Sequence, residues 1–376
     1  MSTIRRFLCL LPAVVVGIPA QTVRVVSPSG PLTQIHSALG LSAPGDIIHV
    51  LPGTYTPFAV TIGCTIRALS PGVQVLASMG PNPANPVTIN PPTGEVVHLA
   101  GLRFAFGTNL FGDSVLINGG RVTLDECSFY SSYDCPLVIS NADVHMQRCT
   151  AVPPTFGFHA MRGNNARITA IDSTFGDNGG FAFHYFASPS IDLINTTLQA
   201  AGCTIRAADG PGGSTTTALH AVGGNVWLSD CTVIGSLSCP IVATSVLVDR
   251  CVLQPTLPSC PTPASGGLLG VSRSQPLQNG APFSLVYKTI PNSYAAVFAS
   301  QELASLTIPG LHAQTQWLGP GVINLGLVFA DSSGDATATW MIPAGAWLVD
   351  QPLWFQGLTG FALPLQLSPV AGGLIR

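Results

Sequence analysis

The sequence predicts an all-β protein in which a β-solenoid is followed by a small β-sandwich. An eight-residue pattern, apolar-x-apolar-x-x-small-x-apolar, recurs seven times between residues 97 and 253. Its sixth position repeats every 20 to 35 residues. Such a period is typical of a solenoid, whose coils bury their apolar faces only by stacking on one another. Beyond residue 267 the pattern stops, and short alternating runs separated by turns predict the sandwich.

The seven copies of the pattern define the expected coils. They begin at Val97, Val122, Val144, Ile168, Ile191, Val226 and Val246, and their sixth positions are Leu102, Cys127, Cys149, Ser173, Thr196, Cys231 and Cys251. The longest interval, 35 residues from Thr196 to Cys231, predicts an inserted loop over residues 201–217. Insertions in a solenoid fall on one face, which is often the binding face.

Residues 1–21 predict a secretory signal peptide. Arg5 and Arg6 are followed by the apolar residues 7–18 and then by Pro19-Ala20. The apolar run is too short to span a bilayer, and Gly or Pro interrupts every later one. We therefore expect a secreted, extracellular protein that is not an integral membrane protein, with the periplasm or the cell surface as alternative locations.

Residues 22–255 are expected to form the solenoid itself. Residues 32–41 predict a short helix, after which a strand is expected at residues 47–51, between Gly45-Asp46 and Pro52-Gly53. This opening resembles that of right-handed parallel β-helix proteins of the pectate-lyase-like type, in which an amphipathic helix covers the first coil. The resemblance extends over about residues 30–255, and the matching positions are Ile35, Ala38, Gly45, Asp46, Ile48, Val50, Pro52, Gly53 and Tyr55. It implies a fold and no single activity, because this fold carries lyases, hydrolases, esterases, epimerases and non-catalytic adhesins.

The C-terminal part of the chain is expected to form a separate module. Residues 256–267 are rich in Pro, Ser and Gly and predict a linker, and residues 268–376 predict the β-sandwich. This part is similar to small C-terminal sandwich modules of secreted bacterial proteins.

Charge content narrows the possible partners. Only 8% of the residues are charged, and loss of the signal peptide would change the formal net charge from −3 to −5. A nucleic-acid partner is therefore not expected, because it usually requires a basic stripe.

Cysteine usage fits an oxidising compartment, and nine of the ten cysteines would remain in the mature chain. Three arrangements are open: disulfides within a coil (Cys127 with Cys135, Cys231 with Cys239), bridges between stacked cysteines, or buried cysteines that stack as small apolar residues.

Alignment of the strand before each pattern places three histidines in one outward column. The central residue of each strand points outward if its neighbours point inward, and these residues are Leu116, Val138, His159, His184, His220 and Val242. Imidazoles ~4.8 Å apart can hold a transition metal or exchange protons near neutral pH. The alternative is a solvent-facing ladder that stacks only for packing, because a metal site needs converging ligands.

Other polar and aromatic residues complete the candidate site. Arg162 and Arg167 are candidate catalytic bases beside the histidines, Asp177 and Tyr185 would contact a substrate, and an exposed Trp227 would stack on a sugar ring. No metal ligand set emerges, so no cofactor is expected, although Ca²⁺ or Zn²⁺ stays an alternative. At the fifth pattern position the charges alternate, which predicts stacked ion pairs at a turn of each coil; the members are Glu126, Arg148, Asp172, Asp230 and Arg250.

The catalytic motifs of the family are largely missing. The single lysine, Lys288, lies in the C-terminal part, and the full galacturonan-hydrolase set of Asn-x-Asp, Asp-Asp, Gly-His-Gly and Arg-x-Lys is absent. We therefore expect a non-catalytic surface, carbohydrate-binding or structural protein. The alternative is a polysaccharide lyase or glycoside hydrolase that acts on extracellular polysaccharide through the outer wall of the β-helix.

Overall fold

The computed structural model describes residues 21–77, 86–106, 113–131, 134–153, 159–176, 188–207, 216–236, 239–256, 260, 269–273, 275–307, 315–319, 321–359 and 366–376. Contacts divide these residues into two compact units, residues 21–263 and residues 264–376. The expected signal peptide lies outside the described residues and stays a prediction.

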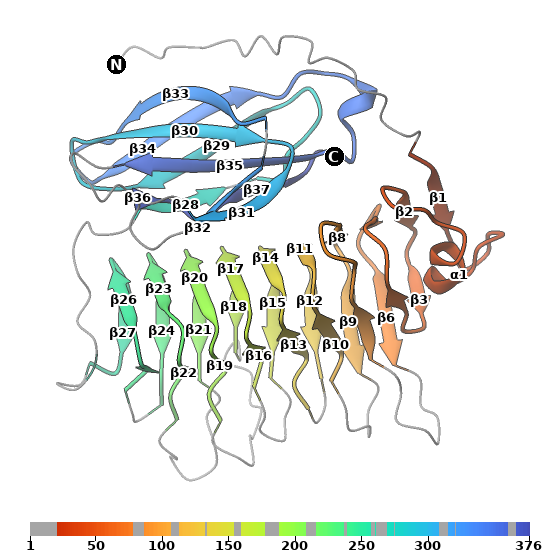
Figure 1. The fold of residues 1–376 in the computed structure, drawn as a ribbon, viewed down its shortest axis with the longest axis horizontal. Coiled ribbons are helices and arrows are strands. Elements are labelled where there is room, and N and C mark those ends of the chain that lie inside the picture. Colours follow the sequence, from red (N-terminus) through yellow and green to blue (C-terminus); the bar gives the residue numbers. More distant parts are fainter. Residues whose placement is uncertain are drawn as a thin grey trace. The chain divides into compact units, whose positions relative to one another are not determined.

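Residues 21–263 form a parallel β-helix with three sheets (Figure 1). Neighbouring strands of each sheet pair in parallel, because consecutive coils stack in register. Sheet A consists of β1 (Val23–Val26), β2 (Ile47–Val50), β5 (Thr65–Ala68), β8 (Val96–Ala100), β11 (Arg121–Asp125), β14 (Asp143–Gln147), β17 (Arg167–Ile171), β20 (Thr197–Ala201), β23 (Val226–Ser229) and β26 (Val246–Asp249).

Sheet B consists of β3 (Gly53–Tyr55), β6 (Val73–Ala77), β9 (Arg103–Phe106), β12 (Ser128–Tyr130), β15 (Thr150–Val152), β18 (Thr174–Phe175), β21 (Thr204–Arg206), β24 (Thr232–Ile234) and β27 (Val252–Gln254). Sheet C consists of β4 (Ala59–Val60), β7 (Val87–Ile89), β10 (Val115–Asn118), β13 (Leu137–Ser140), β16 (Met161–Asn164), β19 (Ile191–Ile194), β22 (Leu219–Val222) and β25 (Ile241–Ala243). The predicted solenoid is confirmed.

A short helix precedes the second strand of the solenoid. Helix α1 (Ile35–Leu39) packs against β1 and β2, and both Ile35 and Ala38 are fully buried. The helix is shorter than the predicted 32–41. Gly40 follows it, and Gln34 before it makes no side-chain cap hydrogen bond.

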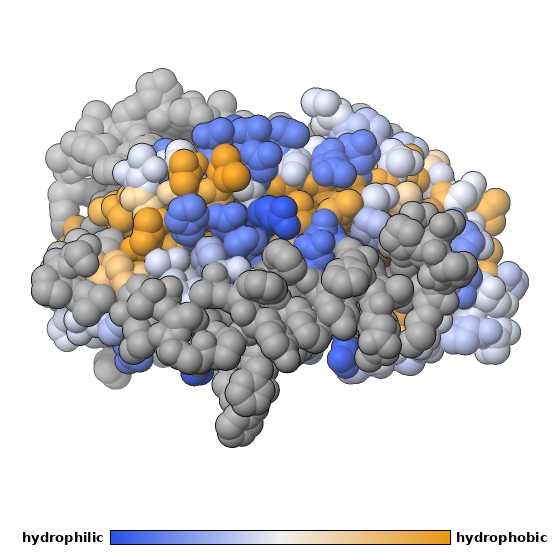
Figure 2. Space-filling view, turned by 90° about the horizontal axis from the view of Figure 1, so that it is seen from below, coloured by the Kyte–Doolittle hydropathy of each residue, from blue (hydrophilic) through white to orange (hydrophobic). Residues whose placement is uncertain are grey.

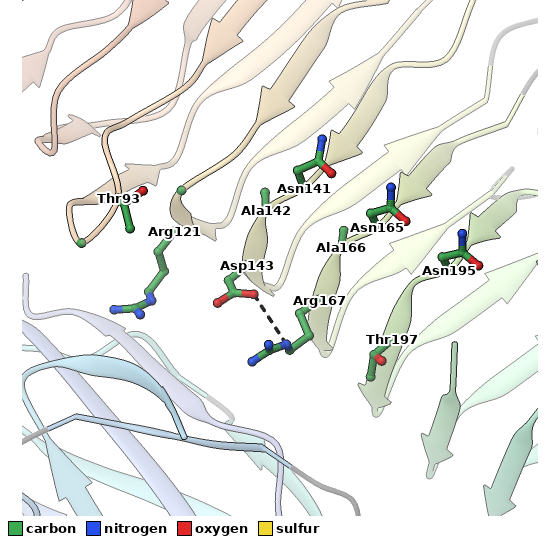
Figure 3. Close-up of a pocket in the computed structure, with 12 residues that line it drawn as sticks. Thr93, Arg121, Asn141, Ala142, Asp143, Asn165, Ala166, Arg167, Asn195 and Thr197 are labelled. Carbon is green, nitrogen blue, oxygen red and sulfur yellow. Dashed lines mark ion pairs between the residues drawn. The ribbon is translucent and has the colours of Figure 1, made fainter. Parts of the chain in front are cut away.

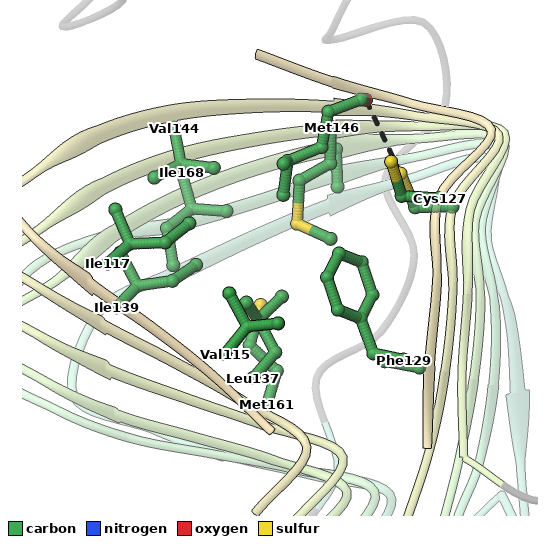
Figure 4. Close-up of a cluster of buried hydrophobic side chains, with 14 of the residues drawn as sticks. Val115, Ile117, Cys127, Phe129, Leu137, Ile139, Val144, Met146, Met161 and Ile168 are labelled. Carbon is green, nitrogen blue, oxygen red and sulfur yellow. Dashed lines mark hydrogen bonds between the residues drawn. The ribbon is translucent and has the colours of Figure 1, made fainter. Parts of the chain in front are cut away.

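The core of the solenoid consists of rows of apolar side chains, one from each coil (Figure 4). Ile117 and Ile139 are register partners in sheet C, and both are fully buried. In sheet B the rings of Phe104 and Phe129 stack with centroids 5.3 Å apart and an interplanar angle of 8°. The pattern recurs because every coil must place an apolar residue beside the same residue of its neighbours.

One of the seven predicted copies is wrong in register. Residues 191–194 form β19 of sheet C, where Ile191 pairs with Met161 and Leu219. The true copy spans residues 198–205, so its sixth position is Cys203 rather than Thr196. Residues 201–206, predicted to open an inserted loop, instead contain the end of β20 and all of β21.

The turn from sheet A to sheet B uses one residue with positive φ in successive coils. The φ angles are 54° at Glu126, 50° at Arg148 and 50° at Arg250. Arg148 Nη2 lies 2.7 Å from Asp125 Oδ1 and 3.0 Å from Glu126 Oε1, and Arg250 Nε lies 3.0 Å from Asp230 Oδ1. The predicted ion pairs between coils are thus confirmed at these positions.

The cysteines beside this turn are buried thiols. Among the described cysteines, Cys127, Cys149, Cys203, Cys231 and Cys251 are free and form an interior row. They stack as small apolar residues, which is one of the three arrangements that the sequence left open. Neither disulfide within a coil, Cys127 with Cys135 or Cys231 with Cys239, is formed. Among the described residues, a disulfide joins Cys239 to Cys260, a pairing that the sequence did not indicate.

Residues 264–376 form antiparallel sheets. One sheet contains β28 (Gly270–Arg273), β29 (Pro282–Lys288) and β34 (Asp335–Met341). A second contains β33 (Ile323–Phe329), β30 (Tyr294–Ser300), β35 (Pro352–Thr359), β36 (Gln366–Leu367) and β37 (Ala371–Leu374). The hairpin β31 (Leu303–Thr307) and β32 (Thr315–Leu318) and the 3₁₀ helix η1 (Ala346–Leu348) complete this unit. The antiparallel architecture agrees with the predicted sandwich.

Candidate functional site

An outward row of side chains crosses sheet C and is charged only in its middle. Register pairing places Arg162 on β16 beside Asp192 on β19, and Asp192 beside His220 on β22. Apolar residues continue the row on both sides, with Val138 before Arg162 and Val242 after His220. Figure 2 shows one face of the molecule, on which a group of hydrophilic residues lies between hydrophobic ones.

The predicted column of three histidines is wrong at His159. Strand β16 begins at Met161, so His159 lies two residues before the strand and Arg162 takes the outward position. His220 stands in the row as predicted. His184, Tyr185 and Asp177 lie outside the described residues.

Asp192 is nevertheless the point at which two histidines meet. Its Oδ1 accepts a hydrogen bond from His220 Nδ1 at 2.8 Å, and its Oδ2 lies 3.7 Å from His159 Nε2. His159 Nδ1 lies 2.7 Å from the carbonyl oxygen of Pro189. Because a carbonyl oxygen only accepts, this nitrogen carries the proton. Burial lowers the pKa of His159, so the neutral ring is favoured near neutral pH.

Two further carboxyl groups lie on the other side of Arg162. Arg162 Nη2 is 3.7 Å from Asp134 Oδ1, and both side chains are partly exposed. Asp113 precedes β10 and is half-buried; its Oδ1 is enclosed without a hydrogen-bond partner. Burial, reinforced by the negative charge of Asp134, raises the pKa of Asp113 to about 6. Asp113 therefore holds a proton at pH values where an ordinary aspartate is ionised.

These six side chains form one cluster, which we call the sheet C cluster: Asp113, Asp134, His159, Arg162, Asp192 and His220. It combines a carboxylic acid that is still about half protonated near pH 6 with a carboxylate that a histidine holds in place. Such groups can donate and accept hydrogen bonds to the hydroxyl groups of a sugar. Two carboxyl groups in unlike states are also the pair that glycosidic bond cleavage requires.

A groove of about 520 Å³ lies at the turns from sheet C to sheet A (Figure 3). We call it the corner groove. Arg121, Asp143 and Arg167 begin the strands β11, β14 and β17 and are register partners. Arg167 Nε lies 3.7 Å from Asp143 Oδ1. The amides of the preceding turns form a second row on the groove; they belong to Asn141, Asn165 and Asn195.

The two predicted catalytic arginines therefore lie in different places. Arg162 belongs to the sheet C cluster, whereas Arg167 lines the corner groove. Sequence reasoning missed Asp113 and Asp134, because both residues precede their strands rather than lying on them. A search for acidic residues two or three positions before each sheet C strand would have found them.

Trp227 does not offer an exposed indole. It lies on β23 of sheet A, is paired with Gln199 and Leu247, and is only 8% exposed. Gln199 and Thr169 of the same row are buried as well. Alternation in the sequence identifies the outward side of a strand, but not whether that side is covered.

Among the described residues, no three His, Cys, Asp or Glu side chains converge closely enough to hold a metal ion. None of the helices in the described part of the chain has the length and apolarity needed to cross a membrane.

No family model and no curated protein matches the sequence. The solved structures that are similar in fold include two phage tailspikes. The enzymatically active domain of tailspike protein 4 from bacteriophage CBA120 is 13% identical with a TM-score of 0.28, and the match covers 91% of this chain and 65% of that one. The full-length tailspike protein 2 from Escherichia coli O157:H7 bacteriophage CAB120 is 9% identical with a TM-score of 0.37, and the match covers 92% of this chain and 63% of that one.

The chain spans a little under two thirds of the length of each tailspike, and the likeness concerns the fold alone. The fold class itself is given by the topology of residues 21–263, in which each of three sheets gains one parallel strand per coil. The chain thus belongs to the proteins with the parallel β-helix fold.

Proposed function

We propose that the protein binds polysaccharide outside the cell through the outer face of sheet C. The observation that carries this proposal is the hydrogen bond between Asp192 and His220, beside Arg162 and between the apolar residues Val138 and Val242 of the same row. Sugars present hydroxyl groups at their edges and C–H groups on their faces, so a surface that mixes charged and apolar side chains suits them. Asp192 is already held by His220, so little conformational entropy is lost when a ligand binds.

The outward side chains next to this row extend the polar surface. Asn118, Ser140 and Asn164 occupy the next outward position on β10, β13 and β16 and are register partners. Ile194 and Val222 follow in the same position on β19 and β22 and are 43% and 52% exposed. An extended ligand can therefore meet polar and apolar patches in turn along the solenoid.

Binding is tested with a panel of neutral and acidic polysaccharides by affinity electrophoresis and calorimetry. Asp192→Asn removes the charge that holds His220, and His220→Gln removes the ring while keeping a polar group. We expect each variant to weaken binding about tenfold, the effect of losing one hydrogen bond to a charged group. Arg103→Gln is the matched control, because Arg103 is exposed on β9 of sheet B. Wild-type affinity in both sheet C variants would refute the proposal.

A glycoside hydrolase is the second candidate, and the raised pKa of Asp113 favours it. A general acid must still hold its proton at the working pH, and Asp113 does so up to about pH 6. Asp192, with its two histidine neighbours, is the candidate for the second carboxylate. If this candidate is right, release of reducing ends falls as the pH rises through 6. Asp113→Asn then abolishes release and leaves binding intact. Turnover retained in Asp113→Asn would exclude this residue as the acid.

A further inference from the structure

We propose that the corner groove is a second binding site, specific for polysaccharides that carry carboxylate or sulfate groups. The groove does not include any residue of the sheet C cluster, so this inference goes beyond the function proposed above. Its ligand class follows from the charges and amides that line it.

Two of the few basic side chains of this protein face the same groove. The chain has only 14 Lys and Arg against 17 Asp and Glu. Arg121 and Arg167 nevertheless line the groove, and Asp143 is the single acid among the described residues that line it, so these side chains give a local excess of positive charge (Figure 3). The side chain of Arg167 is 40% exposed and that of Asp143 is 27% exposed, so both can meet a ligand. A guanidinium group binds carboxylate and sulfate through two parallel hydrogen bonds.

The spacing of the arginines suits an extended ligand. Arg121 and Arg167 start strands that are two coils apart, and Asp143 starts the strand between them. Two strand spacings separate their backbones by about 10 Å. A chain of sugars that runs along the solenoid and carries acid groups at intervals therefore meets both arginines.

The asparagine row adds groups that recognise hydroxyls. Asn141, Asn165 and Asn195 occupy equivalent turns of three successive coils, with φ angles of 52°, 49° and 49°. The equivalent turn of each flanking coil has a glycine instead, Gly119 before them and Gly223 after them. Glycine adopts the positive φ angle of this turn at least as easily as asparagine does. The asparagines therefore concentrate carboxamides, which donate and accept hydrogen bonds, where the groove lies.

The test uses polymers with one backbone and different charges: dextran, carboxymethyl-dextran and dextran sulfate. Affinity is measured by calorimetry at low and high salt, for the full chain. We expect the two charged polymers to bind at least about tenfold more tightly than dextran, with a loss of affinity at high salt. Equal binding of dextran and both charged polymers, or no binding of either charged polymer, would overturn the proposal. Binding of only one charged polymer identifies which acid group the groove accepts and supports it.

Variants locate the binding. Arg121→Gln and Arg167→Gln should each weaken binding of the charged polymers about tenfold. Asp143→Asn should strengthen binding several-fold, because it removes the one negative charge. Arg103→Gln controls for a general loss of positive charge, and circular dichroism checks that each variant is folded. Wild-type affinity in both groove variants, with a loss in Asp192→Asn, would assign anion binding to sheet C and refute the groove as the site.

Discussion

Asp113 should lower the stability of the native protein at neutral pH, and replacement by asparagine should remove this cost. Burial and the neighbouring Asp134 raise the pKa of Asp113 from 3.8 to about 6 in the folded chain. The folded state therefore binds the proton more tightly than the unfolded state does. The proton on Asp113 therefore stabilises the folded state. This stabilisation is fully present below pH 3.8 and is lost as the pH rises through 6.

The magnitude follows from the difference between the two pKa values. About two pH units at about 1.36 kcal/mol each would give about 3 kcal/mol for a fully shielded group. Asp113 is only half-buried, and solvent screening reduces the figure to about 1–2 kcal/mol. An asparagine side chain at this position would resemble the protonated acid in shape and charge. We expect Asp113→Asn to match the wild type near pH 4 and to be about 1–2 kcal/mol more stable at about pH 7.5.

The assay is urea unfolding followed by circular dichroism between about pH 3 and pH 8, a range that brackets both pKa values, 3.8 and about 6. Ser114→Ala is the neighbouring control: Ser114 donates a hydrogen bond of 2.7 Å to the carbonyl of Tyr130 and has no charge. Its loss should cost about 1 kcal/mol at every pH. A difference between Asp113→Asn and wild type that does not change with pH would refute the reasoning. So would a variant that is less stable than wild type at the alkaline end of this range.

Three further predictions follow from the solenoid itself. Phe129→Ala should lower the free energy of unfolding by about 3–5 kcal/mol and Phe129→Leu by much less, because the fully buried ring stacks on Phe104. A loss below about 1 kcal/mol for the alanine variant in urea titrations would contradict this. Asn165→Ala should lower the free energy of unfolding by about 1 kcal/mol and Asn165→Gly should not lower it, because the φ angle of this residue is +49°. Equal melting temperatures of the two variants would argue against strain at this turn. The thiols of Cys149 and Cys231, whose pKa values burial raises, should react with a thiolate-selective reagent near pH 8 only after denaturation; reaction in the native protein would place them near solvent.

Much of the fold could be predicted because one coil must resemble the next. From β8 onward, each sheet A strand contains the start of the eight-residue pattern, in which inward and outward residues alternate, and the pattern ends in a buried residue of sheet B. The register of a single coil was harder. The segment from Ile191 to Ile194 also alternates, since strands of sheet C bury every second residue too. Alternation alone does not distinguish sheet C from sheet A. When a strand is assigned to the wrong register, its side chains are assigned to the wrong positions as well.

The candidate site depended on this register and was predicted only in part. His220 and Arg162 were identified, but His159 was assigned to a strand that begins two residues later. Asp113 and Asp134 could not be connected with Arg162, because loop conformation decides where residues before a strand point. The corner groove likewise depends on turns in which the residues are close in space but about 22 to 30 positions apart in sequence.

Variation in coil length is concentrated at one edge of the β-helix. The connection from sheet C to sheet A takes two or three residues per coil from β10 to β25, and the connection from sheet A to sheet B is equally short in these coils. From β9 onward, the connection from sheet B to sheet C ranges from six residues, 131–136, to fifteen, 176–190. Asp113, Asp134 and His159 belong to these longer connections. Mutation can therefore lengthen, shorten or replace the segments beside the sheet C cluster while the winding stays the same, so ligand preference and folding can change independently over evolutionary time.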